Sequence, residues 1–387
     1  MWGYFSSFFA RLKVQREAWI GLSLVLSSIA LTFVVAELAV RTLGNDPKRW
    51  QWRNFLANPA VTEGRWRTLR HDPLLGYVPR PGYSGRHNVA RVLMTFDEHG
   101  LRVHDRDRPL PTTQMPPILL VGDSYAMGEE VDDDETVAAY LQEMLQRRVL
   151  NGGVLGYGMD QIVLRAEALV RQFQPRSLVV SFIADNVRRA QMRMLWGLEK
   201  PWFDVVDGGL VLRGVPVPPP ALEPLDPVRG VLGYSFLIDV IMRRLELDDW
   251  WLEGQPVRTE EAHEQGAAVS CLLMERLQHL AKDHGAQVLL VAQYTPDAWR
   301  RQSTEDFEVG IIEPVLACAR AAGLRTLDTR DAVEAAVRKG GLDRYYVSRH
   351  MNDDGNRLTA ELIAEALSSA TSSLPAPASE STPTRSR

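Results

Sequence analysis

The hydrophobic pattern of the chain begins with one long apolar stretch near the N-terminus. Residues 18–40 are apolar except for the single charge of Glu37. At about 1.5 Å per residue, an α-helix of this length reaches roughly 34 Å, which is enough to cross a bilayer. The run is too long for the apolar part of a cleaved signal peptide. We therefore predict an N-terminal tail at 1–17 and an uncleaved transmembrane signal anchor at 18–40, with a buried core helix as the alternative.

From residue 116 onward, short apolar runs alternate with amphipathic segments. Strands are expected at 118–121, 149–151, 178–182, 288–292 and 325–327. Helical spacing of apolar positions is found at 136–148, 161–173, 267–282, 307–322, 331–339 and 355–369. Strands that alternate with helices favour a parallel sheet covered by helices on both faces. The pattern predicts a three-layer α/β/α domain at 116–370, built on a parallel five-stranded sheet.

Three segments depart from this alternation. Residues 41–115 are polar and rich in turn residues, which predicts a pre-domain of loops and short strands. An insertion at 192–265 interrupts the domain and contains a hairpin pattern at 202–212. An insertion of this length covers a site, contacts a partner or elaborates the fold, and all three remain open. Residues 371–387 are rich in Ser, Thr, Pro and Ala, which predicts a disordered tail.

Composition narrows the class of protein. The chain has 387 residues, of which 45% are hydrophobic and 24% charged, so a packed core is expected. A net charge of −5 without a basic stripe argues against binding nucleic acid. Cys271 and Cys318 lack metal-ligand spacing, so we expect no zinc. We interpret them as two small buried apolar residues, with a disulfide as the alternative.

Four polar or glycine-rich blocks follow strands at the points where the strands end. They are Gly122-Asp123-Ser124, residues 151–158, residues 184–189 and His350-Met351-Asn352. The carboxyl ends of parallel strands share one edge of a sheet, which is where such folds bind ligands. Serine needs a base to become a nucleophile, and histidine acts as one near neutral pH. Glycine-rich backbone and a side-chain amide supply N–H donors for a tetrahedral oxyanion. The blocks therefore predict acyl-transfer chemistry.

In this order the blocks resemble the SGNH (GDSL) hydrolase family of serine esterases, over about residues 116–369. The chain is most similar to membrane-anchored bacterial members, which share the leading apolar span. They also share a Gly-Tyr-x-x-x-Pro segment, found here at 76–81, and a Gly-Leu-Arg element, found here at 100–102. The resemblance implies a flavodoxin-like SGNH fold.

The resemblance also implies roles for individual residues. Ser124 is the expected nucleophile, His350 the expected general base and Gly156 an expected oxyanion residue. The oxyanion asparagine of the family follows the third strand, where this chain reads Asp185-Asn186. Either Asn186 takes the role in a shifted register, or Asp185 occupies the place.

The acid that orients the base departs from the family pattern. The family places an aspartate two or three residues before its histidine, but here these positions are Ser348 and Val347. Asp343 is the nearest upstream carboxylate and our candidate for the role, and Asp328 and Asp331 are more distant. A Ser–His dyad, with a backbone carbonyl as the orienting group, is the alternative.

The remaining polar features have simpler interpretations. Residues 129–135 are acidic but lack the ligand spacing of a calcium loop, so we predict a solvated helix N-terminus and no metal. Arg188 and Arg189 either bind an anionic or glycan substrate or are ordinary surface charges. Asp123 is expected to brace its turn. Surface or structural roles are expected for His71, His87, His99 and His104.

Together these features suggest a membrane-anchored serine esterase or acyltransferase. The resemblance implies an acyl ester, first of all an acetyl ester, of an envelope carbohydrate as substrate, and no cofactor. It places the protein in the bacterial inner membrane as a single-pass protein with a periplasmic catalytic domain, although basic residues on both sides of 18–40 leave orientation open. The alternative is a catalytically impaired SGNH-fold protein. Such a protein would bind glycan or scaffold a cell-envelope polysaccharide complex, with envelope protein partners on the insertion.

Overall fold

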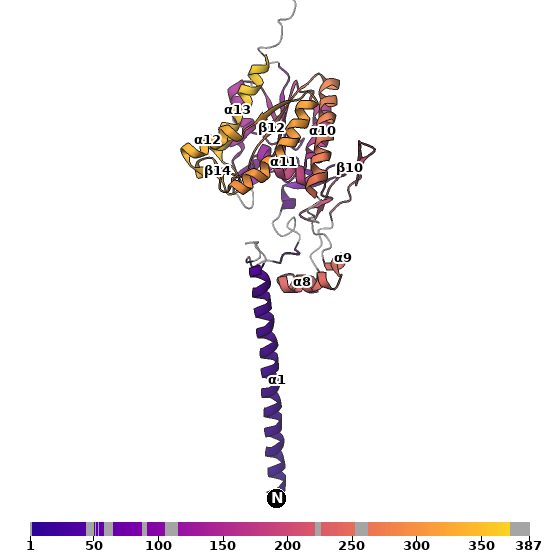
Figure 1. The fold of residues 1–387 in the computed structure, drawn as a ribbon, viewed down its shortest axis with the longest axis vertical. Coiled ribbons are helices and arrows are strands. Elements are labelled where there is room, and N and C mark those ends of the chain that lie inside the picture. The colour runs from indigo at the N-terminus through magenta and orange to yellow at the C-terminus, as the bar shows by residue number, and fades with distance from the viewer. Residues whose placement is uncertain are drawn as a thin grey trace, which may run out of the picture. The chain divides into compact units, whose positions relative to one another are not determined.

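The computed structural model describes residues 2–43, 50, 52, 54–57, 65–86, 91–104, 115–220, 226–251 and 262–371 (Figure 1). His87 and most of the predicted C-terminal tail lie outside these residues. The chain divides into two compact units. The smaller unit combines Met1–Asn58 with Leu222–Gln255, and the larger one combines Pro59–Ala221 with Pro256–Arg387. The insertion at 192–265 is therefore shared between the two units.

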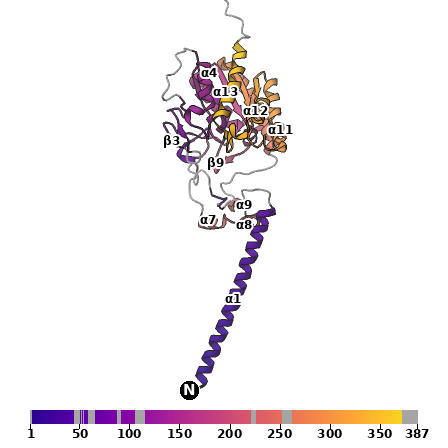
Figure 2. The ribbon, with the colours of Figure 1, turned by 90° about the vertical axis from the view of Figure 1, so that its left-hand side faces the viewer.

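The smaller unit is built on α1 (Trp2–Leu43), whose Trp19–Leu43 stretch is long and apolar enough to cross a membrane. The helix begins at Trp2, so the segment predicted as a tail at 1–17 continues the helix. That segment contains no proline that would stop it. Three short helices complete the unit (Figure 2): α7 (Pro227–Leu232), α8 (Phe236–Arg244) and α9 (Asp248–Trp251).

The single charge of the apolar stretch joins α8 to α1. The Glu37 carboxylate accepts hydrogen bonds from two backbone N–H groups in the first turn of α8, at 3.1 and 2.8 Å, and from Ser235 Oγ at 2.8 Å. Arg41 donates to Glu37 at 2.6 Å and to the Tyr234 carbonyl at 2.7 Å. Glu37 thus satisfies N–H groups that a helix N-terminus leaves without intrahelical partners.

The larger unit contains the predicted five-stranded parallel sheet, in the order β13-β12-β7-β5-β6. Its strands are β5 (Ile118–Val121), β6 (Val149–Asn151), β7 (Ser177–Phe182), β12 (Gln287–Ala292) and β13 (Arg325–Asp328). Numbered along the chain, the spatial order is 2-1-3-4-5, which is the flavodoxin-like order. The predicted fold class is confirmed.

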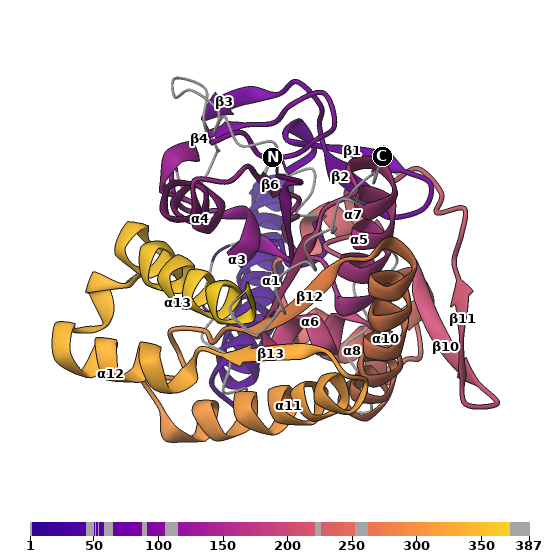
Figure 3. The same ribbon diagram turned by 90° about the horizontal axis from the view of Figure 1, so that it is seen from above.

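Helices cover both faces of the sheet (Figure 3). They are α4 (Val137–Leu145), α5 (Met159–Phe173), α10 (Ala262–His284), α11 (Gln302–Ala321), α12 (Arg330–Gly340) and α13 (Asp353–Thr371). In β5, Ile118 and Leu120 pack with α4 and α13, whereas Leu119 and Val121 pack with α5, α10 and α11. All four side chains are fully buried, which explains the continuous apolar run of this strand.

Five two-stranded hairpins lie around the sheet in the part of the chain that the structure describes, including the predicted one near 202–212. They are β1 (Leu69–Asp72) with β2 (Gly76–Pro79), β3 (Ser84–Arg86) with β4 (Leu93–Thr95), β8 (Met194–Leu195) with β9 (Leu198–Glu199), β10 (Trp202–Val206) with β11 (Gly209–Arg213), and β14 (Tyr346–Val347) with β15 (His350–Met351). The structural role expected for His71 fits its ring Nε2, which lies 2.8 Å from the Val217 carbonyl.

Cys271 on α10 and Cys318 on α11 form a disulfide. Our interpretation of them as two unpaired apolar residues is therefore wrong. The two helices pack side by side and bring the two Cα atoms to 5.2 Å, although the residues are 47 apart in sequence. The apolar pattern identified both helices but carried no information about which helices are neighbours.

The disulfide gives a first testable expectation. Replacing both cysteines, in Cys271→Ser/Cys318→Ser, should lower the free energy of unfolding by roughly 2–4 kcal/mol, because the unfolded chain regains a long open loop. Urea denaturation of the full-length protein in detergent measures the change. Cys271→Ser alone should cost about as much as the double variant, since either removes the bond. Unchanged denaturation midpoints in both variants would contradict the expectation.

Candidate active site

The turn after β5 places Ser124 at the carboxyl edge of the sheet, where the residue is largely buried. Ser124 is the first residue of α3 (Ser124–Met127), and the side chain of Asp123 caps this helix by accepting a backbone N–H at 2.9 Å. A Cβ atom on Gly122 would come within 2.7 Å of two neighbouring atoms, so the turn has no room for another residue. Gly128 ends the helix with a φ of +80°. Asp123 braces the turn as expected.

The structure brings the expected base against the expected nucleophile. His350 lies on β15, and its Nε2 is 2.8 Å from Ser124 Oγ. The hydroxyl of Tyr125, in α3, donates to the Arg349 carbonyl at 2.7 Å and holds the β14–β15 hairpin in place. Ser124 and His350 are thus brought together although they are 226 positions apart in sequence.

A carboxylate that we did not predict lies on the other side of the imidazole. Glu130 Oε2 is 3.0 Å from His350 Nδ1 and accepts the backbone N–H of Arg349 at 3.3 Å. Glu130 lies in the turn that directly follows α3, the short helix that begins with the serine. A carboxylate at Nδ1 holds that nitrogen protonated and leaves Nε2 free to accept the proton of the serine. Ser124, His350 and Glu130 therefore form one hydrogen-bonded chain.

The structure corrects the prediction that Asp343 orients the base. Asp343 is exposed in the 3₁₀ helix Leu342–Arg344, and within the described residues no hydrogen bond joins it to His350. The more distant candidates, Asp328 and Asp331, bond to other side chains. Glu130 takes the place next to the histidine.

The acidic run at 129–135 is also different from its prediction as a solvated helix end. Part of it does begin a helix, since Asp132 and Glu135 form a capping box. Asp133, however, accepts from the buried Arg102 at 3.0 Å, and Asp132 accepts from the Leu93 backbone N–H. The sequence did hold one clue that a carboxylate of this run lies at the site, because the run directly follows the nucleophile turn at the ligand edge of the sheet.

The site is electrostatically negative around the base. Burial alone would lower the pKa of His350, but its hydrogen bond to Glu130 and the charges of Glu129 and Glu130 raise that pKa above its usual value. Glu129 Oε2 is 3.5 Å from Nε2. Burial favours neutral Glu130, yet the bond from His350 lowers the pKa of Glu130 overall. The imidazolium is thus stabilised by two carboxylates.

Asn186 does not serve as the expected oxyanion donor in this structure. It lies fully buried in α6 (Ala184–Arg189), and its Nδ2 donates to Asp123 Oδ2 at 2.9 Å and to the Tyr157 carbonyl at 2.7 Å. Both amide hydrogens are therefore used. Its Oδ1 accepts the Ile183 backbone N–H at 2.6 Å. Asn186 braces the nucleophile turn instead of facing a substrate.

Asp185 cannot supply the missing donor either. Its carboxylate accepts from Arg188 at 3.0 Å and from Arg189 at 3.1 Å. Burial would raise the pKa of Asp185, but the two arginines lower it overall, so the group stays ionised. Arg189 also lies 3.3 Å from the Asp123 carboxylate. The two arginines, for which substrate binding was one interpretation, are thus paired with carboxylates of the protein.

Backbone N–H groups at the site are the remaining candidates for oxyanion donors. Among the described residues, none accepts a hydrogen bond from the backbone N–H of Ser124 or of Gly156. Gly156 has a φ of +71°, and a Cβ there would overlap the Trp196 ring. The same loop is fastened to the nucleophile turn, because the Val154 N–H donates to the Gly122 carbonyl at 3.1 Å. Gly156 is therefore a position where only glycine fits.

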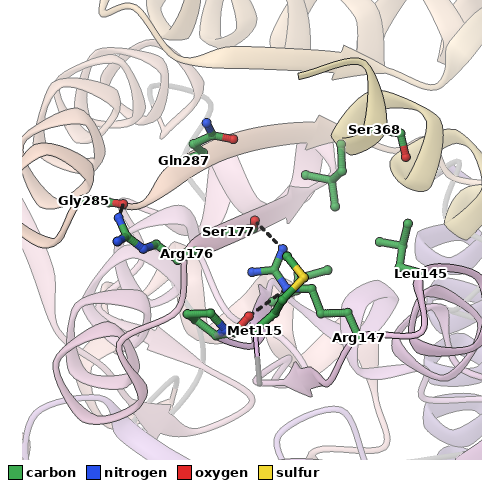
Figure 4. Close-up of a pocket in the computed structure, with 11 residues that line it drawn as sticks. Met115, Leu145, Arg147, Arg176, Ser177, Gly285, Gln287 and Ser368 are labelled. Atoms are coloured by element: carbon green, nitrogen blue, oxygen red, sulfur yellow. Dashed lines mark hydrogen bonds between the residues drawn. The ribbon is translucent and has the colours of Figure 1, made fainter. Parts of the chain in front are cut away.

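A separate cavity of about 430 Å³ lies at the opposite edge of the sheet (Figure 4). Its lining includes Ile118, Ser177 and Gln287, which are the first residues of β5, β7 and β12. Arg147 reaches across it and donates to Ser177 Oγ at 3.3 Å. Because Ser124 follows the other end of β5, this cavity is not part of the catalytic site.

Solved structures similar to this chain include several ester hydrolases. An α/β hydrolase from the metagenome of Lake Arreo is 12% identical, and the match covers 69% of this chain and 100% of that one at a TM-score of 0.40. An acetyl xylan esterase is 14% identical, and the match covers 65% of this chain and 99% of the esterase at a TM-score of 0.40. A GDSL-like lipase from Bacteroides thetaiotaomicron is 14% identical, and the match covers 68% of this chain and 92% of the lipase at a TM-score of 0.37.

No family model and no curated protein matches the chain.

The carboxylate next to His350 should be measurable without any substrate. The pKa of His350 should lie above its usual value of about 6.5 and should fall in Glu130→Gln, because the negative partner is lost. Histidine-selective ¹³C NMR titration reports it, with His350→Gln to assign the signal. Asp343→Asn is the matched control and should leave the pKa unchanged. A larger fall in Asp343→Asn than in Glu130→Gln would restore the original prediction.

Gly156→Ala should distort the loop beside the serine. The left-handed backbone costs an alanine about 1–2 kcal/mol, and the overlap with Trp196 adds to that cost. Thermal unfolding of the variant should show the loss. Gly208→Ala is the control, since Gly208 also has a positive φ but open space around it. Equal losses in both variants would show that the Trp196 overlap has no effect.

Proposed function

We propose that this protein is a membrane-anchored serine esterase that forms an acyl-enzyme at Ser124, with an acetyl ester of an envelope carbohydrate as substrate. The observation that carries the proposal is the chain of hydrogen bonds from Ser124 Oγ through His350 to Glu130, at 2.8 and 3.0 Å. Nucleophile, base and orienting acid are the three parts of a serine hydrolase site. The acetyl group and the carbohydrate follow from the family resemblance.

The first half of the reaction forms the acyl-enzyme. Ser124 Oγ attacks the ester carbonyl carbon while its proton passes to His350 Nε2. Glu130 stabilises the imidazolium that results. The carbonyl oxygen becomes an oxyanion, for which the backbone N–H groups of Ser124 and Gly156 are the donors. The tetrahedral intermediate then expels the sugar oxygen, which takes the proton from His350.

The second half removes the acyl group from Ser124. His350 accepts a proton from the incoming hydroxyl compound, whose oxygen attacks the acyl carbon. The tetrahedral intermediate then expels Ser124 Oγ, which takes that proton back from His350 and restores the free enzyme. Water as the attacking compound gives hydrolysis, whereas a sugar hydroxyl gives acyl transfer. The raised pKa of His350 keeps the imidazole protonated to higher pH. Activity should therefore increase as the pH rises through that value, because only neutral His350 acts as a base.

Two further features support the proposed location. The Trp19–Leu43 stretch could hold the protein in the bacterial inner membrane as a single-pass anchor. The Cys271–Cys318 disulfide supports a catalytic domain on the periplasmic side, because disulfides persist in oxidising compartments.

The alternative of a catalytically impaired scaffold rested on two departures from the family pattern. The apparent lack of an acid no longer favours it, because Glu130 bonds to His350. The second departure still favours it, because the side-chain amide of Asn186 is bonded within the protein and does not face a substrate. The absence of this donor is expected to lower the rate, since removing one oxyanion donor costs about 10²–10³-fold in kcat in other serine hydrolases.

Hydrolysis of a chromogenic acetyl ester by the full-length protein in detergent tests the proposal. Ser124→Ala and His350→Ala should reduce kcat at least 10³-fold, and Glu130→Gln about 10²–10⁴-fold. Asp343→Asn, the matched acidic control, should retain activity. Rates that are equal to background in the wild type and all variants, with intact folding, would sink the esterase. A fluorophosphonate should label the wild type at Ser124 but not Ser124→Ala.

Hydrolysis and transfer are separated by the fate of the acyl group. Incubating the acetyl ester with and without an oligosaccharide acceptor, followed by mass spectrometry, measures free acetate against acetylated sugar. Acetate alone assigns a hydrolase, and acetylated sugar that disappears in Ser124→Ala assigns a transferase.

A further inference from the structure

The helix α8 carries an apolar stripe that the smaller unit covers only in part. Spacing of three and four residues places Tyr234, Leu237, Ile238, Ile241 and Leu245 on one side of the helix and its flanks. Ile241 is 43% exposed and Leu245 is 61% exposed. We call these five residues the apolar face of α8.

The opposite side of α8 is occupied by the rest of the unit. Phe236 stacks on Phe55 with ring centroids 4.9 Å apart. Asp239 accepts from Trp251 Nε1 at 2.8 Å and from Arg243 at 3.1 Å. The helix is thus anchored by one side, while its apolar face is left for another surface.

The apolar face shares a groove with the candidate membrane span. The groove, of about 500 Å³, is lined by Ile238 and Tyr234 on one wall and by Phe33, Val34 and Leu38 of α1 on the other. Its polar members bond to one another, since Ser235 and Arg41 both donate to Glu37. Any medium that surrounds this end of the span therefore also reaches the apolar face of α8.

The direction and the flanks of α8 fit a membrane surface. Figure 1 shows α8 running across the C-terminal end of α1, as a helix in the plane of a bilayer would run relative to a spanning helix. Exposed tryptophan and tyrosine side chains, which favour the membrane interface, surround this region. They are Trp50, Trp52, Tyr234 and Trp250. Arg243 and Arg244 end the helix, where lipid phosphates would meet them.

We propose that α8 is an in-plane membrane anchor whose apolar face inserts into the interface of the phospholipid bilayer beside α1. This inference rests on α1 crossing the membrane, as proposed above. Glu37 then has a specific task, because it fixes the in-plane helix to the spanning helix. A second copy of the chain or another membrane protein is the competing occupant of the face.

Spin labelling of the full-length protein in phospholipid nanodiscs tests the inference. Both cysteines of the chain are in the disulfide, so single cysteines can be introduced and labelled with a nitroxide. Ile241→Cys and Leu245→Cys are the test positions, and Arg243→Cys on the opposite side is the matched control. Labels at 241 and 245 should collide more often with oxygen than with a water-soluble nickel chelate. The label at 243 should show the reverse.

A label within α1 is the control that separates the proposal for α8 from the proposal that α1 crosses the membrane. A label at Val25→Cys, in α1, should favour oxygen if the helix crosses the bilayer. If the label at position 25 collides more often with oxygen but the labels at 241 and 245 collide more often with the nickel chelate, α1 crosses the membrane and α8 is not an in-plane anchor. Labels at 241 and 245 that are immobile and shielded from both reagents would show that protein covers the face, which also overturns it. Preference for nickel at 25 would overturn both.

Discussion

The buried carboxylate of Asp123 is the group around which the candidate site is assembled. It is fully buried and binds its own helix, the Asn186 amide and the Arg189 guanidinium. A charge without water needs such partners, because leaving it unpaired would cost several kcal/mol. Through Asn186 the network also reaches the Tyr157 carbonyl in the glycine-rich loop. One carboxylate therefore ties the nucleophile turn, α6 and the loop together.

This assembly has an effect on the chemistry. Asn186 is committed to Asp123 and Tyr157, so the rigidity of the turn comes at the expense of a side-chain donor for the oxyanion. The site then depends on backbone N–H groups, whose positions are set by the turn and by Gly156. In the proposed mechanism, rigidly held backbone N–H groups thus take the role that a side-chain amide would otherwise have in binding the oxyanion.

Sequence reasoning succeeded where the pattern was local. The strands could be recognised because burial on both faces makes them continuously apolar. The roles of Ser124 and His350 remain predictions, and the structure places their side chains within hydrogen-bonding distance. Glu130 was missed because its partner is 220 residues away and because it lies in a run that contains several other carboxylates. The Cys271–Cys318 pair was missed for the same reason, since helical periodicity does not say which helices touch. Asn186 could be identified by its residue type, but the direction in which its side-chain amide points is set by its hydrogen bond to Asp123.

The placement of the acid gives the catalytic chain an unusual mechanical character. Glu130 and Ser124 belong to one short segment of the chain, whereas His350 lies on a separate hairpin held by Tyr125. The two partners of the imidazole therefore keep a fixed spacing, and the position of this hairpin alone sets both distances from His350, to the nucleophile and to the acid.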